Sequence, residues 1–231
     1  MNALLLPVVA AQAMWKRRRT VTIPAAEGPA TGVVPGPDPQ DPLSVVILGD
    51  SLAAGYGVHT HDEGFGGSLA RDLTELTGRT VAWSAVGQYG ATARRIRYRL
   101  LPRIPEQADI VVIVGGANDV LCGRQPHEWA EDLTAVVDES SRRAGQVMVA
   151  GIPPFEHLPC MPRTLGRHLA RRAVALDEVA QQICDARPAV TWVPGKLLLP
   201  FVPAYFAQDG FHPSALGYRR WSAAVAGEIP T

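Results

Sequence analysis

The sequence predicts an α/β protein in which a parallel five-stranded sheet lies between two layers of helices. Short apolar runs rich in Val and Ile alternate with longer segments of helical periodicity, and these runs are apolar at nearly every position. Strands of that kind belong to parallel sheets that helices cover on both faces. Right-handed crossovers between five such strands favour a three-layer α/β/α sandwich with the strand order 2-1-3-4-5.

Five apolar runs are expected as strands, and helical segments separate them. The expected strands are residues 44–48, 80–85, 109–114, 146–152 and 190–193. The expected helices are residues 62–77, 91–103, 126–144, 163–186 and 214–227. The first helix places Leu69, Leu73 and Leu76 on one stripe, and Thr60 with Glu63 forms a capping-box start. Ser214 is the expected N-cap of the last helix.

The N-terminal 43 residues differ from the rest of the chain. Residues 1–19 are apolar and then basic, and we expect a helix that packs on the domain or lies at a membrane surface. The apolar run is shorter than the ~20 residues of a spanning helix, so a membrane anchor is the less favoured alternative. Residues 20–43 hold repeated prolines and are expected as a linker before a domain at 44–231. The order of apolar and basic residues favours a cytoplasmic protein that contacts the inner face of the membrane through residues 1–19.

Composition limits the kinds of binding partner and the redox compartment that we expect. The 231 residues support one core, and the 22 basic and 22 acidic residues cancel, which argues against nucleic-acid binding. Three cysteines without C-x-x-C spacing argue against a disulfide scaffold or a zinc site, and free thiols fit best. A bridge between Cys122 and Cys160 remains an alternative, because both residues follow strand ends.

Reactive residues follow four of the expected strands, at the edge where parallel sheets place their chemistry. Ser51 follows the first strand, and Asp209 and His212 lie in the loop after the last one. A serine becomes a nucleophile when an imidazole takes its proton and a carboxylate orients that imidazole. The backbone N–H groups of Ser51 and Gly90 and the amide of Asn118 are the expected donors to the oxyanion.

The motifs around these residues resemble those of the SGNH hydrolases, also called the GDSL esterase/lipase family. The four blocks are "GDSL" at 49–52, "YGAT" at 89–92, "GAND" at 116–119 and "DGFHP" at 209–213. The resemblance implies a flavodoxin-like fold, no metal or organic cofactor, and hydrolysis of esters or thioesters through an acyl-enzyme. It also implies that Asp209 and His212 come from one short loop.

The second block departs from the family pattern. Ala85 stands where family members often carry Asn, and Gly87 is a second glycine near Gly90. Either glycine could therefore be the donor. Gly90 is favoured because it directly precedes the helix start at Ala91 and Thr92.

Loop residues outside these assignments are also expected near the site. Residues 153–162 and 197–206 are apolar and either wall an acyl pocket or pack against the N-terminal helix. Asp119 is expected to bond its own backbone, and His59 with His61 to lie in a solvated loop and not at a metal. The residues expected to contact substrate are Asp50, Leu52, Gly87, Phe155 and Phe211.

The sequence thus predicts a serine esterase acting on short- to medium-chain esters, with lysophospholipids or thioesters as further substrates. A carbohydrate O-acetylesterase of the same fold is the alternative within this class. A non-catalytic flavodoxin-like binding module is the alternative outside it. Phosphate or flavin binding at residues 49–52 is disfavoured, because the Asp50 carboxylate would face the anion.

Overall fold

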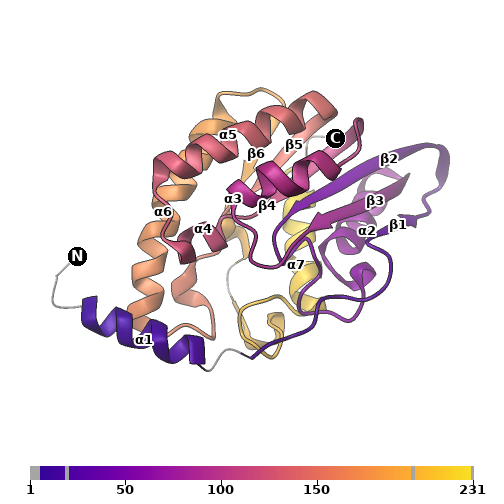
Figure 1. Ribbon diagram of the computed structural model, residues 1–231. Coiled ribbons are helices and arrows are strands. Elements are labelled where there is room, and N and C mark those ends of the chain that lie inside the picture. The colour runs from indigo at the N-terminus through magenta and orange to yellow at the C-terminus, as the bar shows by residue number, and fades with distance from the viewer. Residues whose placement is uncertain (1–5, 19–20, 199–200, 230–231) are drawn as a thin grey trace.

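A six-stranded sheet forms the centre of the protein in the computed structural model, which describes residues 6–18, 21–198 and 201–229 (Figure 1). The strand order is β1-β3-β2-β4-β5-β6, and all neighbours are parallel except the edge pair β1 and β3. The strands are β1 (Thr31–Val34), β2 (Asp38–Gly49), β3 (Arg79–Gly87), β4 (Ala108–Val114), β5 (Ala144–Ala150) and β6 (Val190–Val193).

The five expected strands correspond to β2 through β6, and their order confirms the predicted 2-1-3-4-5 arrangement. The structure differs from the sequence prediction in residues 20–43, which were expected as a linker. Residues 31–34 form β1, paired antiparallel with residues 81–84 of β3, and β2 begins at Asp38. The edge pair tolerates the neighbouring prolines, because an edge strand needs ladder bonds on only one side.

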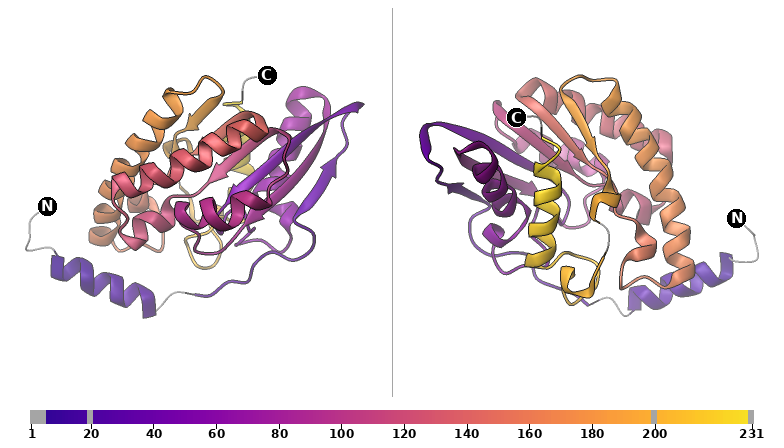
Figure 2. Two further views of the ribbon diagram at one scale, coloured as in Figure 1. Left: turned by 45° about the horizontal axis from the view of Figure 1, so that its top comes forward. Right: turned by 180° about the vertical axis from the view of Figure 1, so that it is seen from behind.

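Helices cover both faces of the sheet (Figures 1 and 2). Helices α2 (Phe65–Thr77) and α7 (Ala215–Ala226) pack on one face, against side chains such as Ile47 and Val112. Helices α5 (Pro126–Arg143) and α6 (Arg163–Asp185) pack on the other, against Val46 and Val111. Neighbouring residues of one strand therefore enter different cores, which explains why the strands are apolar at every position.

The predicted helix starts are confirmed where side-chain caps were expected. Thr60 and Glu63 form a capping box on the short 3₁₀ helix η2 (His61–Glu63), which precedes α2. Ser214 caps α7 by accepting from the Gly217 N–H. Leu76 departs from the expected buried stripe of α2, because its side chain is 57% exposed.

The segment 91–103 is not the single helix that was expected. It divides into α3 (Ala93–Arg95), the π-helical η3 (Ile96–Leu100) and the 3₁₀ helix η4 (Leu101–Arg103). Pro102 has no N–H to continue an α-helical bonding pattern, which explains why the α-helical form does not extend through this turn. Helix α4 (Ala117–Cys122) was not expected, and Gly116 and Gly123 bound it in backbone conformations with positive φ.

Short 3₁₀ helices occupy the loops after β5 and β6. They are η5 (Phe155–His157), η6 (Gly195–Leu198) and η7 (Pro203–Tyr205). No disulfide joins Cys122, Cys160 or Cys184, so the alternative bridge between the first two is not formed in the structure. The remaining helix, α1 (Leu6–Arg18), packs near the start of α6. Residues 1–5 and Arg19 of the expected N-terminal segment lie outside the described residues.

Gly49 brings the end of β2 close to β4. A Cβ built on Gly49 would lie 2.0 Å from the carbonyl oxygen of Val114. That oxygen also accepts from the Asp50 N–H at 3.1 Å, so it cannot move away without losing a bond. Glycine at this position therefore allows the chain to turn directly above the strand ends.

Replacing Gly49 tests this close approach. Gly49→Ala is expected to lower the free energy of unfolding by about 3 kcal/mol or more, because backbone atoms meet the new methyl group. Gly227→Ala is the control, since its Cβ would meet nothing closer than 3.6 Å, and we expect a change within about 0.5 kcal/mol. Urea unfolding measures both, and a Gly49→Ala protein as stable as the wild type would contradict the steric argument.

Candidate active site

Ser51 lies in the turn after β2 and is hydrogen-bonded to His212. The distance between Ser51 Oγ and His212 Nε2 is 2.9 Å, although the two residues are 161 positions apart in the sequence. Tyr56 N–H donates to the Ser51 carbonyl, and Ala54 N–H donates to that of Asp50. These bonds hold the turn, so the hydroxyl has a fixed position relative to the imidazole.

His212 is oriented by Asp209 from the same loop. His212 Nδ1 lies 2.6 Å from Asp209 Oδ2, while Asp209 Oδ1 accepts from the backbone N–H groups of Phe211 and His212. Burial alone would raise the pKa of Asp209, but the imidazole and these N–H groups together lower it below its ordinary value. A carboxylate at Asp209 fixes the Nδ1–H tautomer, which leaves Nε2 to accept the proton of Ser51.

Three groups that could donate to an oxyanion follow the ends of three neighbouring strands, β2, β3 and β4. Within the described residues, the N–H groups of Ser51 and Gly90 have no acceptor at hydrogen-bond distance. Gly90 has a φ of +70°, and nothing lies within 4 Å of where its Cβ would be. Asn118, in the first turn of α4, donates to Asp50 Oδ2 at 3.2 Å and to the Ala91 carbonyl at 3.1 Å.

Gly87 occupies a different position from Gly90. It is the last residue of β3, paired in register with Gly49. A Cβ on Gly87 would lie 2.3 Å from the Ala54 nitrogen, so this glycine packs against the turn that carries Ser51. The structure therefore gives Gly87 a close-packing position and Gly90 an open one.

Asp50 is buried beneath the nucleophile turn and connects it to Asn118. Its carboxylate accepts from the Leu52 N–H at 3.0 Å and from the Asn118 amide. Burial raises the pKa of Asp50 to about 6, against the lowering effect of the Leu52 N–H and of His212. Asp50 therefore supports the positions of two other site residues.

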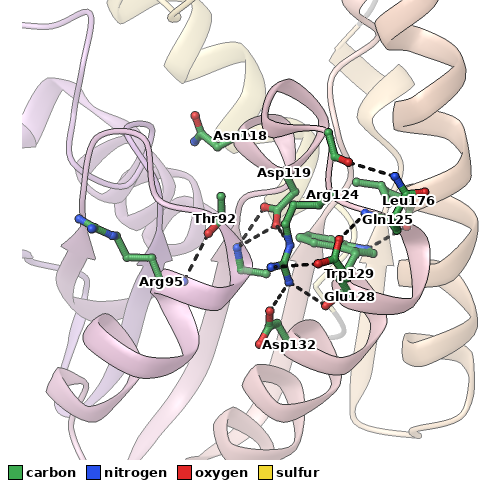
Figure 3. Close-up of polar contacts among 12 residues, drawn as sticks. Thr92, Arg95, Asn118, Asp119, Arg124, Gln125, Glu128, Trp129, Asp132 and Leu176 are labelled. Carbon is green, nitrogen blue, oxygen red and sulfur yellow. Dashed lines mark hydrogen bonds and ion pairs between the residues drawn. The ribbon is translucent and has the colours of Figure 1, made fainter.

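A cluster of charged side chains lies directly below Asn118 (Figure 3). Asp119 is fully buried, and its carboxyl bonds its own backbone N–H, as was expected, while its Oδ2 also accepts from the Ala93 N–H at 3.0 Å. Arg124 lies 3.7 Å from Asp119 and also pairs with the buried Asp132. The cluster ties the segment after β3, which carries Gly90, to α4, which carries Asn118.

The Asp119 cluster was missed because its partners come from segments with no shared motif. Asp119 belongs to the "GAND" block, but nothing in the sequence pairs it with Arg124 or Ala93. Burial raises the pKa of Asp119 to about 6, opposed by the Ala93 N–H and by Arg124.

Two cavities adjoin Ser51, and Phe211 lines both. The larger has a volume of about 420 Å³, within the range of small-molecule sites. Its lining residues are Ala13, Ser51, Tyr89, Asn118, Leu121, Met161, Leu165, Leu169, Asp209, Phe211 and His212. The smaller, of about 70 Å³, is mostly apolar and includes Asp50, Leu52, Phe201 and Phe206 in its lining.

Only some of the residues expected to contact substrate line these cavities. Asp50, Leu52 and Phe211 line these cavities. Phe155 does not, because its side chain is fully buried in the core, where its ring packs 6.4 Å from that of Phe211. Gly87 is also absent from both linings. Tyr89, from the "YGAT" block, lines the larger cavity and was not singled out from the sequence.

His59 and His61 were considered as metal ligands in the sequence. The described residues contain no group of three or more His, Cys, Asp or Glu side chains arranged to hold a metal ion. His59 N–H and Thr60 N–H both donate to the Glu63 carboxylate, which therefore belongs to the cap of η2.

Comparison with known proteins identifies the family. Residues 47–220 match the model of the GDSL-like lipase/acylhydrolase family, a span that contains all four motif blocks. The chain belongs to this family. It is 29% identical over 182 residues to a GDSL-like esterase of Mycobacterium tuberculosis, and the match covers 76% of this chain and 58% of that protein. The chain therefore spans well under two thirds of that relative's length.

Solved structures support the same grouping. A lipase/acylhydrolase from Enterococcus faecalis superposes with a TM-score of 0.60 at 25% identity, over 81% of this chain and 95% of that one. A family 3 carbohydrate esterase from Clostridium thermocellum superposes with a TM-score of 0.61 at 18% identity, over 80% and 93%. The second similarity shows the fold alone.

The buried Asp119 carboxyl predicts a pH-dependent stability. Its pKa is raised from 3.8 in the unfolded chain to about 6, so the folded protein binds more protons between these values and stability falls as pH rises through them. The wild type is expected to lose unfolding free energy between about pH 4 and about pH 7. In Asp119→Asn this loss should be smaller by roughly 1–2 kcal/mol.

Urea unfolding at the two pH values measures this difference. Leu121→Ala, a change at an exposed and non-titrating position of the same helix, should retain the wild-type pH dependence. An Asp119→Asn protein with the wild-type pH dependence would show that this carboxyl does not titrate as described.

Proposed function

We propose that this protein is a serine esterase that hydrolyses carboxylic esters through a covalent acyl-enzyme on Ser51. The observation that carries the proposal is the continuous chain of contacts from Ser51 Oγ to His212 Nε2 and from His212 Nδ1 to Asp209, at 2.9 Å and 2.6 Å. The relatives described above, an esterase and a lipase/acylhydrolase, agree with this chemistry.

In the first half of the reaction, Ser51 Oγ attacks the ester carbonyl carbon while its proton moves to His212 Nε2. The Asp209 carboxylate stabilises the imidazolium that forms. His212 then donates the proton to the leaving oxygen as the bond from the carbonyl carbon to that oxygen breaks. Water resolves the acyl-enzyme by the same route, giving a carboxylic acid and the free serine.

We assign the oxyanion to the N–H groups of Ser51 and Gly90 and to the Asn118 amide. Both backbone groups lack acceptors among the described residues, so they are free to bind the developing charge. The Asn118 N–H that now reaches Asp50 is the one expected to turn to the substrate, since catalytic bonds often tighten only when substrate is bound. Gly90 is preferred to Gly87 because Gly87 packs against Ala54.

The lining of the larger cavity favours esters with an apolar acyl chain. Besides the catalytic groups it presents an apolar part made by Leu121, Met161, Leu165, Leu169 and Phe211. A carbohydrate O-acetylesterase would bind its polar substrate through donors and acceptors, which this part of the cavity lacks. Simple esters, lysophospholipids and thioesters with an apolar acyl chain differ in the leaving group, so it is the leaving group that decides which of them the enzyme hydrolyses.

Replacing Ser51 tests the proposed mechanism. The wild type should be labelled by a fluorophosphonate probe and should hydrolyse p-nitrophenyl esters, whereas Ser51→Ala should lose the labelling and about 10³-fold or more of kcat. Asn118→Ala should keep the labelling site but lower kcat by about 10²–10³-fold, because it removes one oxyanion donor.

Circular dichroism of each variant controls for folding. A folded Ser51→Ala protein that retains wild-type ester hydrolysis would reject the nucleophile assignment. Folded wild-type protein that neither reacts with the probe nor hydrolyses any ester would favour the non-catalytic binding module instead.

We also propose that α1 contacts a membrane surface. Its Val8, Met14 and Trp15 side chains are 43%, 61% and 50% exposed, and the basic residues 16–18 follow directly. Exposed apolar side chains beside basic residues fit the surface of an anionic bilayer. In the described part of the chain, every helix is too short or too polar to cross a bilayer. A cytoplasmic location remains a prediction, to be tested by cell fractionation.

Vesicle sedimentation tests the membrane contact. Trp15→Ser combined with Met14→Ser should lower the fraction bound to phosphatidylglycerol vesicles by about fivefold or more, since apolar burial supplies much of interfacial binding. Val174→Ser, which removes an exposed apolar side chain of α6, is the matched control and should bind as the wild type does. Equal binding by all three proteins would reject a role for α1.

A further inference from the structure

Helix α1 contributes to the larger cavity although it lies outside the part of the chain that the family model matches. Ala13 of α1 lines this cavity together with Leu165 and Leu169 of α6. The matched region begins only at residue 47. Figures 1 and 2 show α1 beside the start of α6, at one end of the molecule.

The side chain of Gln12 bonds α1 to the start of α6. Gln12 Oε1 accepts from the Leu165 N–H at 2.8 Å, across 153 positions of sequence. Leu165 is the third residue of α6, and N–H groups in the first turn of a helix have no partner within the helix. Pro162, the N-cap residue, offers no side-chain acceptor, so Gln12 supplies the cap that α6 lacks.

One face of α1 lies toward the protein. Val9, Gln12 and Ala13 have the spacing of one helical face, and Val9 packs against the core cluster. Trp15 is half-exposed and lines a further cavity with Gln12 and residues 159–162, whereas Met14 is 61% exposed. Among the described α1 side chains, Ala13 alone is in the lining of the larger cavity; it is exposed and carries a single methyl group.

The cavity lining holds two chemically different sets of side chains. Ser51, Asn118 and His212 form the polar set, at which the ester carbonyl is to be placed. Leu165 and Leu169 of α6 are apolar, and α1 bonds to Leu165 through Gln12 and contributes Ala13 to the same lining. A substrate with its ester at Ser51 would place an apolar chain against this apolar set and α1.

We propose that α1 is a wall of the acyl-chain site and that Ala13 is a specificity-determining residue, because the size of its side chain sets the chain length accepted. The inference rests on the proposed esterase function and refines its substrate class to esters whose acyl chain is long enough to reach α1. Gln12 is then a positioning residue, which holds this wall against α6.

Two matched variants on α1 test the proposal. Ala13→Trp fills the cavity beside Leu165, whereas Ala11→Trp adds the same side chain at an exposed position on the opposite face of the helix. Ala13→Trp should lower kcat/KM for p-nitrophenyl decanoate by about tenfold or more and leave the acetate ester within about twofold. Ala11→Trp should match the wild type on every ester.

Gln12→Ala provides a second test that introduces no bulky group. Loss of the acceptor for the Leu165 N–H should loosen α1 and flatten the preference among chain lengths, with acetate hydrolysis retained. Calorimetric binding of decanoate, the expected product, gives a readout that needs no turnover. Ala13→Trp should weaken this binding about tenfold, and Ala11→Trp should not change it.

Several outcomes would overturn the inference. An Ala13→Trp protein that hydrolyses all esters as the wild type does, or loses activity on all of them equally, would remove Ala13 from the acyl-chain site. If Ala13→Trp changed kcat/KM only along a series of acetates whose alcohol grows longer, α1 would line the site of the alcohol group and not that of the acyl chain. If the wild type hydrolyses esters but the variants do not change the preference between decanoate and acetate esters, only this inference fails. If the wild type neither hydrolyses esters nor binds decanoate, both proposals fail.

Discussion

The hydrogen bond between Ser51 and His212 depends on the parallel arrangement of the central strands. Because β2, β3 and β4 run in the same direction, the turns that carry Ser51, Gly90 and Asn118 meet at one edge of the sheet. The loop with Asp209 and His212 reaches this edge just before α7, which packs beside α2 on the sheet. The position of the last helix thus decides whether the imidazole meets the hydroxyl.

The sequence predicts this frame well because its signals are local. Continuous apolar runs identified β2 to β6 and their order, and side chains that cap helices identified the starts of η2 and α7. Strand β1 has only four residues, and two of them face solvent, so its apolar signal is weak. Helix α4 has six residues between glycines, too short for helical periodicity to show.

The sequence predicts those residues of the candidate site that belong to the four motif blocks. Ser51, Asp209 and His212 lie together as the four blocks indicated, and Asn118 adjoins them. Phe155 was expected at the substrate because it follows β5, but its side chain is buried in the core, and sequence does not distinguish a buried loop aromatic residue from one that lines a site. Arg124 and Ala13 reach the site region only through tertiary packing, which no short-range pattern records.

The antiparallel strand β1 has an effect beyond the site. It pairs with residues 81–84 of β3, and Gly32 lies flat against the Trp83 ring, where a Cβ would be 2.7 Å from the indole nitrogen. Without β1, the middle of β3 would present unpaired N–H and C=O groups along the rim of the sheet, where another chain could add a strand. The proline-rich segment thus covers this stretch of β3 with a strand of the same chain.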